Sequence, residues 1–366
     1  MLSFMNNIDR SKYSFFKTFE APQGDYRDTV IGYMLKMADY EWVAGEDFSI
    51  TWKSQGDFKV SLNYEKGKKY YGVPYSQARA TLDQFTMFAN DGKPFTSPNY
   101  YYEEMVGNHC SSSIGLCYQQ LIDFPFAGRL MPNTARKDVL SFVNGLERPD
   151  KDDYYTQDIF DLNGQERVFE AYASVQAGDI INKIKEGTGH ARMAHYVKTV
   201  RDENGKIDPE NSYVFCIEQT NEFDKTRTDR ITTWWIDRPY SFQKLWNTKF
   251  MPVTLNIFHT KKPLEDAYIA FDKNNSPDTI ANGLKGKVVS NFPLSYVRAT
   301  VTDKYSKVVG EIYKYKFMAQ YSIDLEEYSD ELDISNLPQG EYNYELRAGI
   351  GRGGCIIESF SFEINK

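Results

Sequence analysis

Three residues that lie far apart in the sequence, Cys110, His190 and Glu218, occur in the order that nucleophilic acyl transfer requires. A cysteine thiolate can attack an acyl carbon, a histidine can take and return the proton, and a third polar group can hold the imidazole in one tautomer. Each residue alone has a more common explanation, since single cysteines usually pack in cores and single glutamates usually face water. Their ordered combination favours a cysteine nucleophile.

Cys110 stands where the sequence predicts the start of a short buried helix. Ile114, Cys117 and Leu121 follow at spacings that place apolar side chains on one helical face. Unpaired N–H groups at a helix start lower the pKa of a thiol. We therefore expect a reactive thiolate at Cys110, with its own backbone N–H as the first donor of an oxyanion hole. The neighbouring Ser111 can cap the helix and contact the oxyanion.

A predicted β-hairpin brings His190 and Glu218 together. Residues 190–200 alternate as a strand, residues 213–220 form the returning strand, and Asn204-Gly205 is a strong turn signal between them. A turn centred there pairs positions whose numbers sum to about 409, and His190 and Glu218 come within one of that sum. The register therefore predicts that the two side chains lie close together across the hairpin.

The composition of the 366-residue chain excludes several classes of protein. With a net charge of −8 and no basic cluster, the chain is not expected to bind nucleic acid. It has no run of about 18 apolar residues that could span a membrane. Its four cysteines form no C-x-x-C pair and no zinc-ligand spacing with the four histidines, so neither a metal nor another cofactor is expected.

Length and pattern predict two domains. Residues 25–43 have helical spacing and the hairpin adds strands, so residues 1–262 are expected to form an α+β domain. The polar, turn-like segment 273–278 indicates a boundary between domains near this part of the sequence. Short alternating β segments then recur between residues 284 and 364, which predicts an all-β, immunoglobulin-like sandwich over residues 263–366.

The motifs around these residues resemble those of the NlpC/P60 and CHAP groups of papain-like cysteine peptidases and amidases. Cys110 is followed by Gly178-Asp179 before one strand and by Gly189-His190 at the start of the next. Ile217-Glu218-Gln219-Thr220 looks most like the CHAP version, in which a glutamate follows the histidine. Pro74-Tyr75 is similar to the Pro-Tyr that precedes the nucleophile in NlpC/P60 domains.

The resemblance implies a papain-like catalytic domain that works without a cofactor. It assigns the roles of nucleophile, acid–base, orienting carboxylate and pocket tyrosine to Cys110, His190, Glu218 and Tyr75. The chain departs from the pattern at His109, where Asp or Asn is common, and at Ser76-Gln77-Ala78, where Trp-Gly-Gly is usual. These departures, and the aromatic run Tyr100-Tyr101-Tyr102, predict a remodelled substrate cleft.

From the resemblance we expect a hydrolase that cleaves an amide bond in bacterial cell-wall peptidoglycan, as a stem-peptide endopeptidase or an amidase. Two alternatives stay open: a papain-like hydrolase of a non-wall peptide, amide or ester, and a catalytically inactive protein that binds wall or glycan. The segment 284–344 looks like β-sandwich modules of secreted cell-wall hydrolases of gut Gram-positive bacteria. That likeness implies glycan or wall contact through the C-terminal domain and an extracellular or cell-surface location, with the leader absent from the chain.

Overall fold

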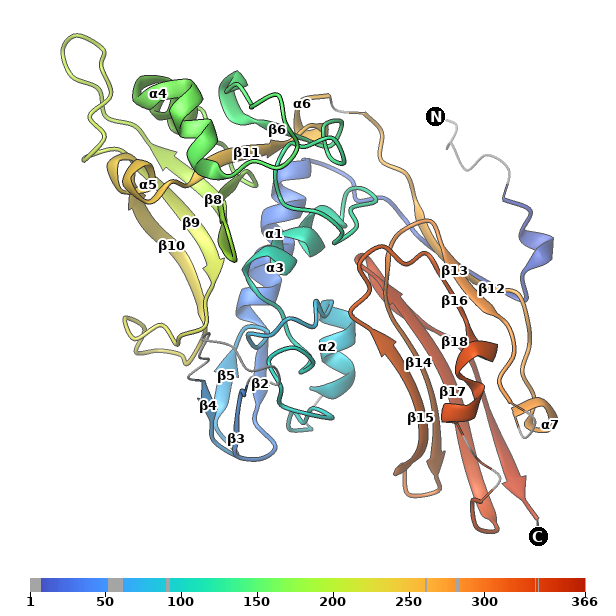
Figure 1. Ribbon diagram of the computed structural model, residues 1–366. Helices are drawn as coiled ribbons and strands as arrows, with labels where there is room; N and C mark the ends of the chain where they lie inside the picture. Colours follow the sequence, from blue (N-terminus) through green and yellow to red (C-terminus); the bar gives the residue numbers. More distant parts are fainter. Residues whose placement is uncertain are drawn as a thin grey trace.

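The computed structural model describes residues 8–51, 62–89, 93–260, 262–280, 283–332, 334 and 336–365. Within them, the protein is a mixed α+β structure with several sheets, as the sequence predicts at this level (Figure 1). Two hydrophobic clusters lie in separate parts of the chain, one over residues 30–258 and the other over residues 267–362. None of the described helices combines the length and the apolar character that crossing a membrane requires.

A six-stranded antiparallel sheet forms the centre of the first part. Its strands are β6 (Leu140–Phe142), β7 (Ile180–Lys185), β8 (Thr188–Lys198), β9 (Tyr213–Gln219), β10 (Trp234–Ser241) and β11 (Met251–Leu255), in the spatial order β10-β9-β8-β7-β11-β6. β8 and β9 pair antiparallel, with Ala194 opposite Cys216. The predicted hairpin between residues 190 and 220 is therefore confirmed.

Two helices pack together beside this sheet. α1 (Tyr26–Asp39) begins after Asp25, whose carboxylate accepts a hydrogen bond from the N–H of Arg27 at 2.7 Å. α3 (Cys110–Tyr118) packs against α1, β8 and β9, and the Cys117 thiol lies 3.7 Å from the Met34 sulfur. In Figure 1, α1 and α3 run between the six-stranded sheet and the C-terminal strands. α3 is therefore buried along most of its length.

The other elements of the first part are short. The helix predicted over residues 25–43 ends at Asp39, because the following residues form β2 (Glu41–Val43), which pairs with β5 (Lys69–Tyr71). The remaining elements are β3 (Phe48–Ser49), β4 (Asn63–Tyr64), α2 (Leu82–Phe88), α4 (Thr156–Ala173), α5 (Phe242–Thr248), α6 (Ile257–Thr260) and the 3-10 helices η1 (Arg10–Lys12) and η2 (Val143–Gly145).

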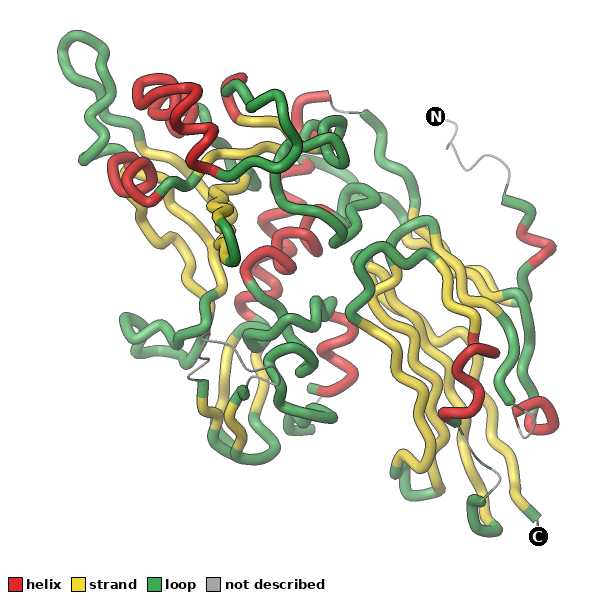
Figure 2. Tube along the Cα trace, viewed as in Figure 1, coloured by secondary structure: helices red, strands yellow, loops and turns green. Residues whose placement is uncertain are grey.

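Most of the C-terminal third forms two antiparallel sheets with a shared core, here called the two-sheet unit (Figure 2). One sheet has the order β1-β12-β13-β16 and the other the order β15-β14-β17-β18. The strands are β1 (Phe15–Phe19), β12 (Ala267–Phe271), β13 (Lys287–Ser290), β14 (Leu294–Asp303), β15 (Val308–Tyr315), β16 (Ser322–Asp324), β17 (Gly340–Ile350) and β18 (Gly353–Ile364), with α7 (Pro277–Ile280) and the 3-10 helix η3 (Leu325–Glu331) between them. Ile269 of one sheet and Val297 of the other belong to the same core.

The first strand of the chain belongs to the two-sheet unit. β1 pairs antiparallel with β12, with Phe15 opposite Phe271. Phe15 and Phe19 both pack against the core of the unit. The predicted boundaries assign these residues to the domain over residues 1–262. The structure instead places the strand with the later segment, because its two phenylalanines cover apolar surface that β12 shares with the second sheet.

A single arginine joins the two-sheet unit to the end of α3. Arg352 donates from Nε to the carbonyl oxygen of Gln120 and from Nη2 to that of Leu121, both at 2.9 Å. In return, the Gln120 amide donates to the Gly351 carbonyl oxygen at 2.6 Å. A guanidinium satisfies the unpaired carbonyl groups that follow a helix and suits the negative end of its dipole. The two-sheet unit thus holds the far end of the helix that begins at Cys110.

Candidate active site

Cys110 is the first residue of α3, as the sequence predicts. His109 caps the helix: its Nδ1 accepts a hydrogen bond from the N–H of Ser112 at 3.3 Å, and its own N–H donates to the Ser112 hydroxyl at 2.9 Å. Within the described part of the chain, the N–H groups of Cys110 and Ser111 have no acceptor. Two unpaired donors therefore lie next to the thiol, where an oxyanion would form.

The thiol of Cys110 shares its cavity with two histidines, His109 and His190. Burial raises the pKa of the Cys110 thiol, but hydrogen bonds with His109 and His190 and the charges of those rings outweigh burial. The pKa of Cys110 is therefore held well below its usual range. By contrast, burial alone raises the pKa of Cys117. Of these two cysteines on the same helix, Cys110 is thus the one poised as a thiolate.

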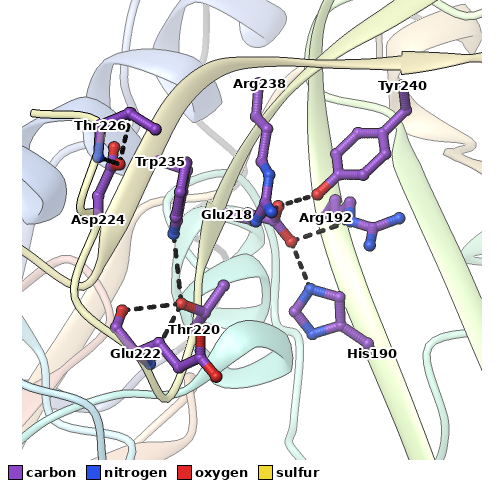
Figure 3. Close-up of polar contacts among 10 residues, drawn as sticks. All are labelled: His190, Arg192, Glu218, Thr220, Glu222, Asp224, Thr226, Trp235, Arg238 and Tyr240. Carbon is purple, nitrogen blue, oxygen red and sulfur yellow. Dashed lines mark hydrogen bonds and ion pairs between the residues drawn. The ribbon is translucent and has the colours of Figure 1, made fainter. Parts of the chain in front are cut away.

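His190 of β8 links the thiol to Glu218 of β9. Its Nε2 lies 2.5 Å from Oε2 of Glu218 (Figure 3), which leaves Nδ1 as the nitrogen that exchanges a proton with Cys110. Burial lowers the pKa of His190, while its hydrogen bonds with Cys110 and Glu218 raise it, with a net result of about 9. The two shifts together favour a thiolate–imidazolium pair at neutral pH.

Glu218 is enclosed by four donors. Its Oε2 accepts from Nε of Arg192 at 2.9 Å as well as from His190, and its Oε1 accepts from Nη1 of Arg238 at 3.0 Å and from the Tyr240 hydroxyl (Figure 3). The side chain is 1% exposed. Burial raises the pKa of Glu218, but the His190 hydrogen bond and the Arg192 charge lower it well below its usual range. Glu218 is thus a fixed, fully ionised carboxylate.

Aromatic rings hold the two arginines beside Glu218. The Arg192 guanidinium carbon lies 3.8 Å from the ring centre of Tyr240 and 3.9 Å from that of Phe250. The Arg238 guanidinium lies 3.9 Å from the ring centre of Trp235. Such stacking fixes the planar guanidinium groups and shields their bonds to Glu218 from water.

The hairpin register near the site differs from the predicted one by one position, since its paired residue numbers sum to 410 rather than about 409. Met193 pairs with Ile217 and Ala194 with Cys216, so continuation of the ladder places Arg192 across from Glu218. His190 is then a diagonal neighbour on the same face, near enough for the hydrogen bond. The proximity of His190 and Glu218 is confirmed, and Arg192 donates to the same carboxylate oxygen as His190.

Several site residues were not identified by the sequence pattern. His109, noted in the sequence only as a departure from the family pattern, is the helix cap and lowers the pKa of the Cys110 thiol. Arg192 could have been found, since it follows His190 by two residues and so shares its strand face. Arg238 and Tyr240 follow a bulge in β10 where Asp237 has φ of 57°, and such a bulge redirects side chains without a signal in the alternation.

Tyr75 and Ser111 both line the cavity that contains Cys110. The Tyr75 ring stacks on Tyr102 at 5.4 Å between centroids, and burial next to Cys110 raises the pKa of Tyr75 far above its usual range. Tyr75 is therefore a neutral hydroxyl beside the thiol. The Ser111 hydroxyl lies 3.2 Å from His109 Nδ1, so its backbone N–H rather than its side chain is free for an oxyanion.

Asp179 and Gln219, two residues of the predicted motifs, make hydrogen bonds to neighbouring segments of the chain. Asp179 is buried and accepts hydrogen bonds from Arg27 at 2.9 Å and from Thr254 at 2.6 Å. The Gln219 amide donates to the Val73 carbonyl oxygen at 2.7 Å. These contacts tie α1, β11 and the loop before Tyr75 to the sheet that carries His190 and Glu218.

The pKa shifts predict an unusual pH profile for alkylation of Cys110. With iodoacetamide, the rate constant should stay nearly constant from about pH 8 down to about pH 6, because the thiolate persists below its ordinary pKa. An unperturbed thiol would slow about tenfold per pH unit over that range. His190→Ala should move the inflection of the profile toward the ordinary cysteine range. A tenfold loss per pH unit in the wild-type protein would contradict a thiolate–imidazolium pair.

The assembled site can perform acyl transfer with its own side chains. Cys110 supplies the nucleophile, His190 the proton exchange and Glu218 the orientation of the ring. In the described part of the chain, no three His, Cys, Asp or Glu side chains gather as a metal site requires. Comparisons of the chain with protein-family models, with curated proteins and with solved structures found no match.

Proposed function

We propose that the protein is a cysteine hydrolase that cleaves an amide bond in bacterial peptidoglycan, as a stem-peptide endopeptidase or an amidase. One observation carries the proposal: Cys110 begins a helix and lines one cavity with His190, whose Nε2 lies 2.5 Å from Oε2 of Glu218. This geometry supports acyl transfer by a thiolate. The choice of peptidoglycan depends on the resemblance of the motifs to those of NlpC/P60 and CHAP enzymes.

In the acylation step, the Cys110 thiolate forms a bond to the carbonyl carbon of the substrate amide. The carbonyl electron pair moves to oxygen, which accepts hydrogen bonds from the unpaired N–H groups of Cys110 and Ser111. The imidazolium of His190 then gives its proton to the amide nitrogen as the carbon–nitrogen bond breaks. The amine leaves, and a thioester to Cys110 remains.

In the deacylation step, neutral His190 takes a proton from a water molecule that attacks the thioester carbon. The carbon–sulfur bond breaks, the acid product leaves, and the thiolate–imidazolium pair is restored. Glu218 stays ionised throughout, because its pKa lies well below its usual range. Its role is to hold Nε2 so that Nδ1 points at the reaction.

The proposal extends to the fold and the place of action. A papain-like domain over residues 1–262 is supported by a nucleophile at the start of α3 that packs on the strands bearing His190 and Glu218. An immunoglobulin-like sandwich over residues 263–366, completed by β1 from the start of the chain, is supported by two four-stranded antiparallel sheets with one core. A peptidoglycan substrate places the protein at the cell surface, where the two-sheet unit would contact wall or glycan.

Incubation with muropeptides from purified peptidoglycan tests the proposal. Mass spectrometry should find products that have gained one water and carry a new amine and a new carboxyl group. Pre-treatment with iodoacetamide should abolish their formation, since it blocks Cys110. Cleavage of unrelated peptides with intact muropeptides would support the alternative of a non-wall hydrolase, and an unreactive Cys110 with tight glycan binding would support an inactive binding protein.

A further inference from the structure

The cavity around Cys110 is positively charged in a protein whose net charge is −8. Its volume is about 640 Å³, and the described residues that line it include four permanent cations and no aspartate or glutamate. The cations are Arg79, Arg129, Arg136 and Lys183. Because the chain has more acidic than basic residues, this distribution points to a ligand of opposite charge.

Arg79 carries a charge that the described protein does not neutralise. Its Nη1 donates to the Lys316 carbonyl oxygen at 3.1 Å, and its guanidinium lies 5.5 Å from the ring centre of Phe126. Among the described residues, no carboxylate pairs with it, and burial lowers the pKa of Arg79. Its φ of 58° lies in the left-handed region, which non-glycine residues seldom adopt outside functional sites and turns.

Arg79 and the first residues of α3 line the same cavity. Phe126, over which it lies, packs so closely on α3 that a Cβ atom at Gly115 would come within 2.7 Å of its ring. Gly115 is five residues after Cys110, a rise of about 7.5 Å along the helix. Arg79 therefore lies beside the helix whose first residue is Cys110, and both residues line one cavity.

Lys183 supplies a second unpaired charge on the opposite strand. It pairs directly with His190 in the β7–β8 ladder and lines the same cavity. Its ammonium lies 5.7 Å from the ring centre of Phe250, and no carboxylate of the described chain pairs with it. Arg129 differs, because Asp153 neutralises it at 3.1 Å. Arg136 is buried, and its Nη2 donates to the carbonyl oxygens of Pro125 and Ala127. Arg79 and Lys183 are thus the half-buried cations of the cavity wall with which no described carboxylate pairs.

We propose that the site takes an acyl donor that carries a carboxylate, which Arg79 and Lys183 hold while Cys110 attacks the neighbouring amide. This inference rests on the proposed function, since it needs Cys110 as the nucleophile. A carboxylate matches a guanidinium and an ammonium that lack protein partners. Acidic peptides are therefore preferred over neutral peptides of the same size.

The ratio of two alkylation rates tests the charge of the cavity without a known substrate. Iodoacetate and iodoacetamide both form a sulfur–carbon bond with Cys110 and release iodide, but only iodoacetate is anionic. Labelling is followed on the Cys110 peptide by mass spectrometry. We expect the iodoacetate-to-iodoacetamide ratio to exceed that of free cysteine, and Arg79→Gln or Lys183→Gln to lower it by about three- to tenfold. Lys185→Gln, an exposed cation on the same strand that does not line the cavity, should leave it unchanged.

The outcomes separate this inference from the proposed function. A reactive Cys110 with an equal ratio in wild type, Arg79→Gln and Lys183→Gln would overturn the charged cavity and leave the nucleophile intact. No labelling by iodoacetamide in the wild-type protein would overturn both.

Protection of Cys110 by peptides identifies the carboxylate. One peptide carries its only carboxylate at the C-terminus, a second carries it on a glutamate side chain, and a neutral parent has none. Slower iodoacetamide labelling with either charged peptide supports the inference and shows which carboxylate is bound. Equal protection by all three peptides would overturn it.

Discussion

Cys110→Ala is expected to abolish hydrolysis of muropeptides and to leave the fold intact. Without the thiolate no thioester can form, so kcat should fall by at least about 10⁴-fold. The free energy of unfolding should change by less than about 1 kcal/mol, because alanine is a good helix former and Cys110 is half-buried at the helix start. Product formation and a urea unfolding curve measure the two effects.

Cys355→Ala is the matched control for this substitution. Cys355 is also a half-buried free cysteine, but it lies in β18 of the two-sheet unit. Burial raises the pKa of the Cys355 thiol to about 11, so it is not a nucleophile at neutral pH. This variant should retain wild-type kcat. Normal turnover by Cys110→Ala would remove Cys110 from the mechanism.

Glu218→Gln is expected to lower both stability and turnover. The amide is nearly isosteric with the carboxylate, but it leaves the charges of Arg192 and Arg238 in a buried site without their counter-ion. Breaking a buried ion pair in this way costs about 3 kcal/mol of unfolding free energy. Loss of the partner that fixes the His190 tautomer should lower kcat by about 10²- to 10⁴-fold.

The stability loss should depend on pH. Because the pKa of Glu218 is lowered in the folded protein, its contribution is complete above about pH 5, the end of the range in which an unfolded glutamate titrates. As pH falls toward the lowered pKa, the wild-type carboxylate becomes protonated and the contribution disappears. Urea unfolding of wild type and Glu218→Gln should therefore differ most near neutrality and converge in acid.

Glu170→Gln tests whether burial of the carboxylate causes the stability loss expected for Glu218→Gln. Glu170 makes two bonds to Arg201, at 2.7 and 2.8 Å, yet both side chains are more than 40% exposed. Exposed pairs contribute less than about 1 kcal/mol. Equal losses of unfolding free energy in Glu218→Gln and Glu170→Gln would show that the enclosure of Glu218 adds nothing to the stability of the protein.

The central pairing of the site could be predicted because it depends on local pattern. The turn at Asn204-Gly205 fixes an approximate register, and His190 and Glu218 fall on one face of the hairpin. In the observed register, whose pairs sum to 410 rather than about 409, His190 and Glu218 are diagonal neighbours, so the prediction of proximity survives the shift. The helix start at Cys110 is also local, since the apolar spacing after it indicates a helix, although the cap is His109 rather than the predicted Ser111.

The residues that complete the site depend on contacts between distant strands. Arg238 and Tyr240 reach Glu218 from β10 after a bulge, and alternation along β10 does not show where that bulge falls. Likewise, five residues of β1 give no indication that their partner is β12, about 250 residues later. The sequence pattern indicates which side chains share one face of a helix or strand. The pairing of strands that lie far apart in the sequence depends on the packing of the whole chain.

The position of β1 makes the candidate enzyme domain an insertion within another fold. The chain leaves the two-sheet unit after Phe19 and returns to it at Ala267, and the N–H of Ala21 donates to the Asp266 carboxylate at 2.7 Å. The two junctions of the insert are therefore neighbours. An insert with adjacent ends can be joined to its host without stretching either core. Cutting the chain between residues 262 and 263 would leave β1 attached to the insert as an unpaired strand. The boundary between the two parts of this protein therefore consists of two positions in the sequence, one after Phe19 and one before Ala267.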